Sequence, residues 1–246
     1  MKLPPWTPPV PAAPKNPPQL TARSLHDPRT QEVLDDLDEI LAAGVPGQVN
    51  ERFQNKCWEV LLDSDTGRRN LNFGLLLDAL RPEDGVALHV LFNKMHQEGR
   101  DFPGEYATFA TRWGQVDGAG SLRYYFTEAD KAPAPADVHN ALKGWAQKNP
   151  KEALAWAVAN RALAAGKPHP GFGPQEDPVM GVIHGWARMD VAGATAAMKA
   201  QFSDPEERAQ AVSIIYKESL FGNGLHATLD WIKQLPDSPE DSNEGG

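Results

Sequence analysis

The chain of 246 residues contains a single cysteine, Cys57, and this scarcity excludes two kinds of site. One thiol forms no disulfide within the chain, and a thiolate metal site needs several cysteines. Cys57 falls on an apolar stripe at helical spacing. We therefore interpret it as a small buried core residue and not as a nucleophile.

Long apolar runs are also missing. No run of 18 apolar residues is present, and the opening stretch MKLPPWTPPVPAAP has no apolar segment of the kind that a secretory signal contains. The sequence thus predicts no membrane span and a cytoplasmic location. The alternative is a periplasmic or secreted protein whose signal or anchor has been removed.

Familiar catalytic motifs are absent from the sequence, which has no Gly-x-Ser-x-Gly, no phosphate-binding loop and no His-Glu-x-x-His. The seven histidines include no pair at metal-ligand spacing within a helix, although His89 and His96 share a face and His139 and His184 are expected to approach across neighbouring hairpins. Metal ligands must be held together as a set. We therefore assign no catalytic residue, no metal and no cofactor.

Positive charge is scarce, because 24 Lys and Arg face 33 Asp and Glu, for a formal charge of −9. Nucleic-acid binding depends on cations that neutralise phosphates, and binding to an anionic membrane surface depends on basic clusters. Both roles are disfavoured. A nucleic-acid-binding repeat of the HEAT-like repair kind stays an alternative only if a basic stripe lies within the acidic total.

Proline, in contrast, is abundant, and eight of the 22 prolines lie within the first 18 residues. Proline fixes φ and biases the preceding residue away from helix, so residues 1–25 are predicted to form an extended tail that acts as a tether. Residues 237–246 are predicted to be an acidic frayed tail. Between the tails, residues 26–236 are expected to form one domain, with 26–100 as a cap or as diverged repeats.

Within that domain the apolar residues recur at helical spacing, as Val33, Leu37 and Ile40 illustrate. Four helix starts carry an Asp or Asn followed by proline, at Asp27, Asn149, Asp177 and Asp204. Two of them, Asn149 and Asp204, have a glutamate three residues later and are expected to form a capping box. We predict about twelve short helices and no sheet.

A tryptophan-marked pattern repeats in the second half of the chain. Trp113, Trp145 and Trp186 are each followed four residues later by an Asp or Asn that is expected to cap the next helix. A linker of two or three residues makes successive helices turn back on each other, so each tryptophan is predicted to fill a helical hairpin. A degenerate fourth copy has Tyr216 at the tryptophan position.

This punctuation, in which Trp is followed by Asn or Asp and the units are spaced by 32 and 41 residues, resembles bacterial α-hairpin repeat proteins of the tetratricopeptide and HEAT-like kind. The resemblance covers residues 103–236. It implies an all-α fold in which stacked antiparallel hairpins form a short right-handed α-solenoid. It also implies a non-enzymatic scaffold that binds a protein or peptide partner, and it carries over no catalytic residues.

The side of each first helix opposite the tryptophan carries the predicted binding residues. Positions two before and two after each tryptophan lie four apart, on one face of the helix. If the hairpins stack, these polar pairs line up along one exposed surface, as the inner helices of a solenoid do. The six residues are Thr111, Gln115, Lys143, Gln147, His184 and Arg188.

Two further possibilities remain open at the level of sequence. One alternative is that the chain is an all-α hydrolase or lyase with an acidic active site in a helical hollow. A close pair of carboxylates, or a histidine with a carboxylate partner, would favour this enzyme hypothesis. The loop at residues 166–177, with His169 and Phe172, is alternatively a contact point on a rigid scaffold.

Overall fold

The computed structural model describes residues 27–129, 133–164 and 177–235, and every regular element in these ranges is a helix. The predicted tails and nearly all of the loop at residues 166–177, including His169 and Phe172, lie outside the described residues. The all-α prediction is confirmed, and eleven described α-helices pack together.

Four helices and one short 3₁₀ segment build the N-terminal region, which spans residues 28–97. They are α2 (Pro28–Ala42), α3 (Glu51–Leu61), α4 (Thr66–Leu77), η1 (Pro82–Asp84) and α5 (Gly85–Gln97). In this region α4 packs against both α2 and α3, and α3 also contacts α5.

The C-terminal region spans residues 103–232 and holds the tryptophan-marked stretches. Its helices are α6 (Pro103–Thr127), α7 (Pro135–Lys148), α8 (Pro150–Ala159), α9 (Arg161–Ala164), α10 (Pro178–Met189), α11 (Val191–Gln201) and α12 (Pro205–Ile232). Non-helical backbone at Asp117 divides α6, and a left-handed glycine at Gly224, with φ of 80°, divides α12. The region therefore consists of four successive helix pairs, with the short α9 after the second pair.

Most helix starts follow the predicted chemistry. The side chain of Asp27 accepts a hydrogen bond from the backbone of the first turn, and Asp177 and Asp190 do the same for α10 and α11. Asp204 accepts from two backbone N–H groups, those of Glu206 and Glu207. The expected capping box at Asn149 is wrong, because its side chain makes no capping hydrogen bond. Asn149 is also the residue at which α7 ends.

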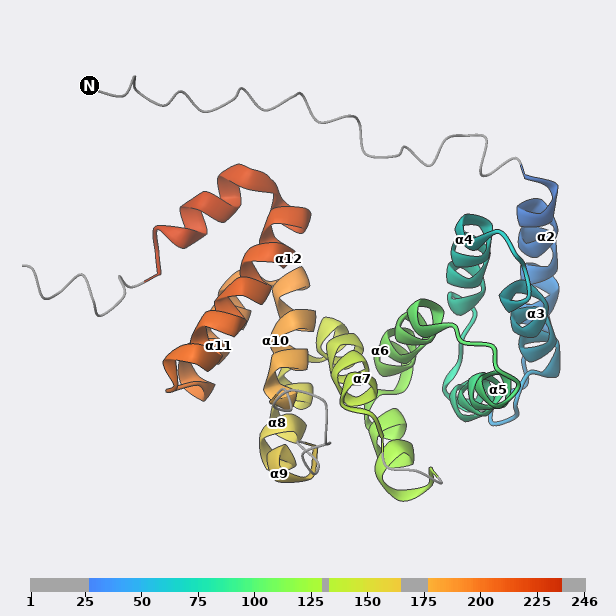
Figure 1. The fold of residues 1–246 in the computed structure, drawn as a ribbon, viewed down its shortest axis with the longest axis horizontal. Helices are drawn as coiled ribbons and strands as arrows, with labels where there is room; N and C mark the ends of the chain where they lie inside the picture. The colour runs from blue at the N-terminus through green and yellow to red at the C-terminus, as the bar shows by residue number, and fades with distance from the viewer. Residues whose placement is uncertain (1–26, 130–132, 165–176, 236–246) are drawn as a thin grey trace, which may run out of the picture.

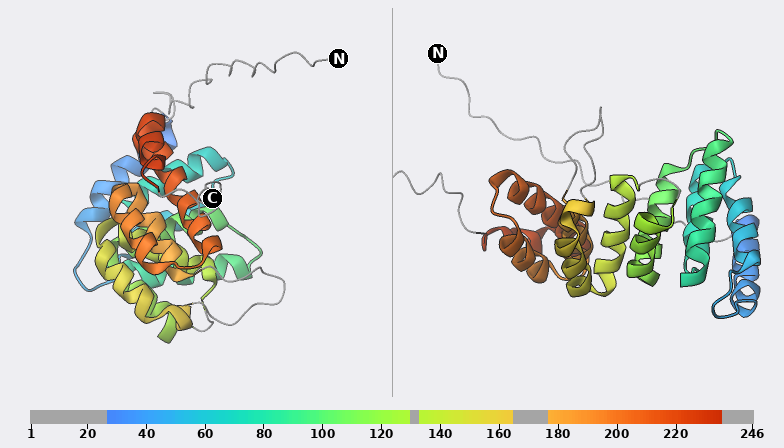
Figure 2. Two further views of the ribbon diagram at one scale, coloured as in Figure 1. Left: turned by 90° about the vertical axis from the view of Figure 1, so that its left-hand side faces the viewer. Right: turned by 90° about the horizontal axis from the view of Figure 1, so that it is seen from below.

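The first helices of the four pairs lie side by side (Figure 1). We call them the first-helix row: the part of α6 before Asp117, then α7, α10 and the part of α12 before Gly224. Each member packs on the next, and Figure 2 shows the same succession from below. The arrangement brings residues that are 30 to 45 positions apart in the chain onto one side of the molecule.

None of the described helices combines the length and the apolar character that crossing a membrane requires. The longest two, α6 and α12, are the divided ones, and both carry charged residues throughout.

Candidate functional site

Glycines set the spacing of the first-helix row. A Cβ atom added at Gly144 of α7 would overlap the carbonyl oxygen of Thr111 in α6, and one at Gly114 would overlap that of Ala141 in return. Gly185 of α10 stands in the same relation to the carbonyl oxygen of Lys143. The helices therefore touch backbone to backbone, which only a residue without a side chain permits. The glycine of each Gly-Trp-Ala stretch thus has a packing role beside that of the tryptophan.

A cavity of about 460 Å³ lies beside these contacts and is lined by residues of α4, α6, α7 and α10. Five of the six predicted binding residues line it: Thr111, Gln115, Lys143, Gln147 and Arg188. Four of the five are half-buried and only Arg188 is exposed, so most of the face that the sequence predicted to be exposed is half-buried. The physical reason is the glycine contact, because helices this close shield the side chains beside the contact.

Besides Asp78 at the end of α4 and Thr108 of α6, the sequence argument missed two polar residues of the lining, Arg112 and Asn140. Each lies three positions before a predicted residue, Gln115 and Lys143 respectively, and therefore on the same helix face. A search at spacings of three and four from each predicted residue would have found both.

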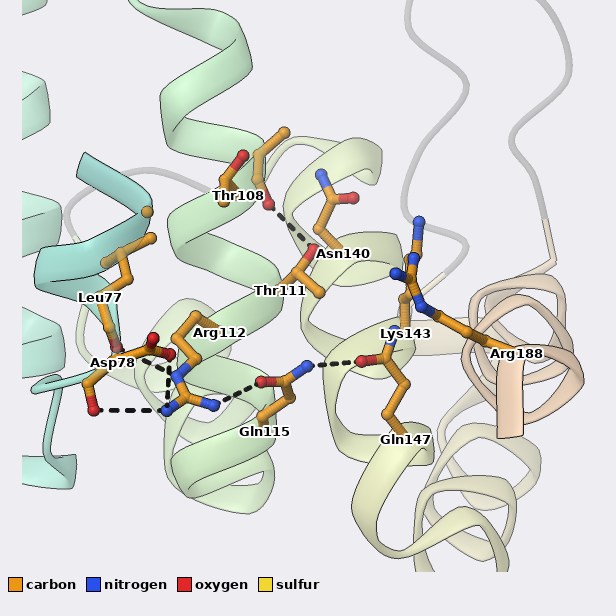
Figure 3. Close-up of a pocket in the computed structure, with 12 residues that line it drawn as sticks. Leu77, Asp78, Thr108, Thr111, Arg112, Gln115, Asn140, Lys143, Gln147 and Arg188 are labelled. Carbon is orange, nitrogen blue, oxygen red and sulfur yellow. Dashed lines mark hydrogen bonds and ion pairs between the residues drawn. The ribbon is translucent and has the colours of Figure 1, made fainter. Parts of the chain in front are cut away.

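A chain of polar contacts crosses the floor of the cavity (Figure 3). The Arg112 guanidinium donates to the backbone oxygen of Leu77 at 3.0 Å and to the Gln115 side-chain oxygen at 2.8 Å. Gln115 in turn donates to the side-chain oxygen of Gln147 on the next helix. The same guanidinium lies 3.5 Å from the carboxylate of Asp78, the one carboxylate among the described lining residues. Arg112 is therefore held in place, with its charge partly balanced.

Two other cations in the cavity lack such a partner. Among the described residues no carboxylate lies within 4 Å of the Lys143 or the Arg188 side-chain nitrogens. Burial lowers the pKa of Lys143, the charge of Glu218 opposes that shift, and the charge of Arg188 adds to it by a smaller amount. Figure 3 shows Arg188 reaching from α10 toward Lys143 on α7. The cavity thus concentrates positive charge within an acidic chain.

His184, the sixth predicted residue, does not line this cavity. Its Nδ1 lies 3.1 Å from Nε2 of His139 on α7, and its Nε2 lies 2.9 Å from the Glu218 carboxylate on α12. The predicted approach of His139 and His184 across neighbouring pairs is confirmed. Burial, together with the charge of Lys143 and the neighbouring His139, lowers the pKa of His184 to about 4, although Glu218 opposes the shift. The imidazole is therefore neutral at pH 7 and links three members of the row.

The three marker tryptophans lie against small residues of neighbouring helices. Trp113 packs on Tyr125 with ring centroids 5.4 Å apart and is 1% exposed. Trp186 lies against Gly193 of its own pair, whereas Trp145 lies against Gly118, in the second helix of the preceding pair. Tyr216, at the equivalent place in the fourth pair, is 37% exposed. The tryptophans are packing residues, and the degenerate copy lacks this packing.

The histidines and the one cysteine of the described ranges are placed as follows in the fold: they form no metal-binding group, and the thiol is buried. No group of three or more His, Cys, Asp or Glu residues there is arranged to hold a metal ion. His89 and His96 face different partners, since His89 bonds Tyr106 while His96 bonds Asp101. Cys57 is fully buried, and burial raises the pKa of its thiol far above the ordinary value.

Comparison with known proteins identifies no relative: no family model matches the chain, and neither a curated protein nor a solved structure does.

Proposed function

We propose that the protein is a non-enzymatic scaffold, a short right-handed α-solenoid of stacked hairpins, and that it binds a partner protein through an acidic peptide segment laid across the first-helix row. The observation that carries the proposal is the pair of cations, Lys143 and Arg188, in the cavity across α4, α6, α7 and α10, with no carboxylate within 4 Å of either among the described residues. The succession of packed pairs supports the solenoid.

Charge favours an acidic segment. Two neighbouring cations repel each other, and the depressed pKa of Lys143 reflects the cost of keeping it charged where it is half-buried. A carboxylate between Lys143 and Arg188 would relieve that cost and form charge-assisted hydrogen bonds with both. A guanidinium also offers two parallel N–H groups to one carboxylate.

The neutral part of the lining suits a peptide backbone. Along the same side of the row lie the Asn140 amide, the Gln147 amide nitrogen and the oxygen of the Thr111 hydroxyl, whose proton is donated to the Ala107 carbonyl. Such groups donate to and accept from the main chain of an extended segment. A polyphosphate backbone fits less well, because it needs a long basic stripe and the chain as a whole carries −9.

Fluorescence anisotropy with a labelled peptide tests the proposal. The probe is a twelve-residue peptide that alternates Glu with Ala, and its matched form replaces every Glu by Gln. We expect the full-length protein to bind only the Glu peptide, and the double variant Lys143→Met with Arg188→Gln to weaken that binding about 30-fold, as the loss of two charged contacts implies.

Lys148→Gln is the matched control, since Lys148 is exposed on α7 outside the cavity lining. It removes one positive charge, whereas the double variant removes two, and it should leave binding within about twofold. An equal loss of peptide affinity in the control and in the double variant would mean that the peptide is held only by the overall positive charge of the surface, and would contradict the proposed site. A double variant that melts well below the wild type would show that the two cations are structural.

One observation favours the second candidate function, an all-α hydrolase or lyase. His184 has a carboxylate partner, Glu218, and a second imidazole, His139, in contact. A general base works best when its pKa lies near the working pH, and the pKa of His184 is about 4. We therefore place this candidate second.

A further inference from the structure

A second cavity, of about 440 Å³, opens between α5, the later part of α6 and the start of α7. It shares no lining residue with the first cavity. The residues that shape its chemistry are His89, Asn93, Tyr124, Tyr125 and Asp137.

Three rings form one wall of this cavity. The His89 ring meets Tyr124 at 5.3 Å and Tyr125 at 5.6 Å between centroids, both edge to face. The two tyrosine rings are 6.2 Å apart and tilted by 58°. Aromatic faces carry partial negative charge, so a corner of such rings attracts a cation.

Hydrogen bonds keep the His89 imidazole neutral and fixed. The Asn93 amide nitrogen donates to Nε2 at 2.8 Å, so the ring proton is on Nδ1, which donates to the Tyr106 hydroxyl at 2.9 Å. Burial lowers the pKa of His89, so that the ring stays uncharged at neutral pH. The imidazole therefore adds no positive charge to the wall.

Asp137 supplies a carboxylate whose negative charge is balanced by few neighbouring groups. Burial raises its pKa to about 6, and the backbone N–H of Ala134 donates to it at 3.1 Å. Within the described ranges no Lys or Arg nitrogen lies within 4 Å of it. The other ionisable lining groups are turned elsewhere, since Lys94 lies over the Trp58 ring and His96 bonds Asp101. At neutral pH Asp137 is a half-buried anion that has no counter-ion among the described residues.

We propose that this cavity binds an organic ammonium group, with Asp137 as its counter-ion and the corner of His89, Tyr124 and Tyr125 as its aromatic wall. A metal ion fits less well, because hard cations need several oxygen ligands and the cavity offers one carboxylate beside carbon-rich rings. The site is independent of the acidic-peptide function, which uses other residues and the opposite charge.

Titration by two-dimensional NMR of the ¹⁵N-labelled full-length protein tests this site. The probes are tetramethylammonium chloride and n-butylammonium chloride, with sodium chloride at equal ionic strength as the reference. We expect saturable shifts at millimolar probe around Tyr124, Tyr125 and Asp137. Saturation by the quaternary probe alone indicates a methylated ammonium ligand, and saturation by the primary probe indicates a lysine-like one.

Asp137→Asn should weaken the binding at least tenfold, because it removes the charge while the amide oxygen still accepts from Ala134. Glu98→Gln removes an exposed carboxylate just after α5, outside the cavity lining, and should have no effect. Absence of saturable shifts, or equal binding by Asp137→Asn and wild type, would overturn the proposal.

A measurement on the wild type keeps the test open if Asp137→Asn fails to fold. The ¹³C signal of the Asp137 carboxyl reports its pKa directly. A bound ammonium ion favours the ionised form, so saturating probe should lower that pKa by at least one unit. An unchanged value would refute the assignment of Asp137 as the counter-ion.

Discussion

The N-terminal region fills the space between its helices with large side chains, whereas the first-helix row removes that space. The fully buried residues of α3, α4 and α5 include Phe53, Leu61, Phe73, Leu76, Leu88 and Met95. The C-terminal pairs also bury large side chains, such as Trp113, Phe109 and Leu142, but their buried set adds many alanines, and glycines stand at the helix contacts. The buried alanines include Ala141, Ala146, Ala153, Ala157, Ala187 and Ala194.

The difference explains why the binding residues gather in the C-terminal region. Side chains that hold helices apart also cover the surface between them, but a backbone contact leaves the flanking polar residues of adjacent helices side by side. Gln115 of α6 reaches Gln147 of α7 for this reason, and Arg188 of α10 comes near Lys143. The candidate site thus depends on glycines that take no part in binding.

The largest expected effect on stability comes from replacing a helix-contact glycine, Gly144, by alanine, and the same replacement at Gly74 in the N-terminal region is its comparison. Gly144→Ala places a Cβ into the Thr111 carbonyl and should cost about 3 kcal/mol of unfolding free energy, since helix backbones cannot yield as side chains do. Gly74→Ala in α4 meets nothing within 4 Å and should stabilise by about 0.5–1 kcal/mol through helix propensity. Urea unfolding followed by circular dichroism measures both. Equal changes in unfolding free energy for the two variants would contradict the idea that backbone contacts at glycine distinguish the first-helix row from the N-terminal region.

The next largest effect should come from lowering the pH, which removes the stability contributions of His184 and Asp63 one after the other. The folded pKa of His184 is about 4, below its ordinary 6.5, so its contribution is present above pH 6.5 and is lost as pH falls toward 4. Arg68 holds the pKa of Asp63 in the N-terminal region at about 2, so that contribution is lost only as pH falls from about 4 toward 2. The contribution of His184 should therefore be lost at higher pH than that of Asp63.

His184→Gln isolates the earlier of these two losses. Between pH 6.5 and 4 the wild type should lose about 2 kcal/mol more stability than the variant, a figure reduced for the partial exposure of the imidazole. Asp137, with its pKa raised to about 6, acts in the opposite direction, but it does so in both proteins and cancels in the difference. Parallel curves of unfolding free energy against pH would contradict the role given to His184.

Local features of the fold could be predicted from the sequence, whereas contacts between distant residues could not. Helix starts and apolar stripes are local, so Asp27, Asp204 and the stripe through Val33 and Ile40 predicted their elements correctly. The role of Gly144 depends on a carbonyl 33 residues away, which no local pattern encodes.

The same limit applies within the site. Spacing alone placed five residues in the cavity, but the position of His184 depends on Glu218 in a helix that the repeat describes only in degenerate form. Partners chosen by tertiary packing decide such cases, and these partners lie beyond the reach of periodicity.

The smallest effect should come from charge in the N-terminal region. The Lys56 ammonium is 9% exposed and contacts Asp36 at 2.7 Å, Glu32 at 3.2 Å and Glu59 at 3.3 Å. Burial acts to lower the pKa of Lys56, but the three carboxylates outweigh it and raise the pKa. Its contribution is thus present below about pH 10 and is lost only at higher pH.

Lys56→Met keeps the apolar stem but leaves three acids to repel one another, which should cost about 1 kcal/mol in dilute buffer. Because the carboxylates are 41–64% exposed, 0.5 M sodium chloride should reduce the cost to about half. Lys199→Met on α11 removes an exposed lysine from the C-terminal region and should change stability by less than about 0.5 kcal/mol at either salt concentration. A salt-independent loss in Lys56→Met would mean that the packing of its stem, and not its charge, stabilises the α2–α3 contact.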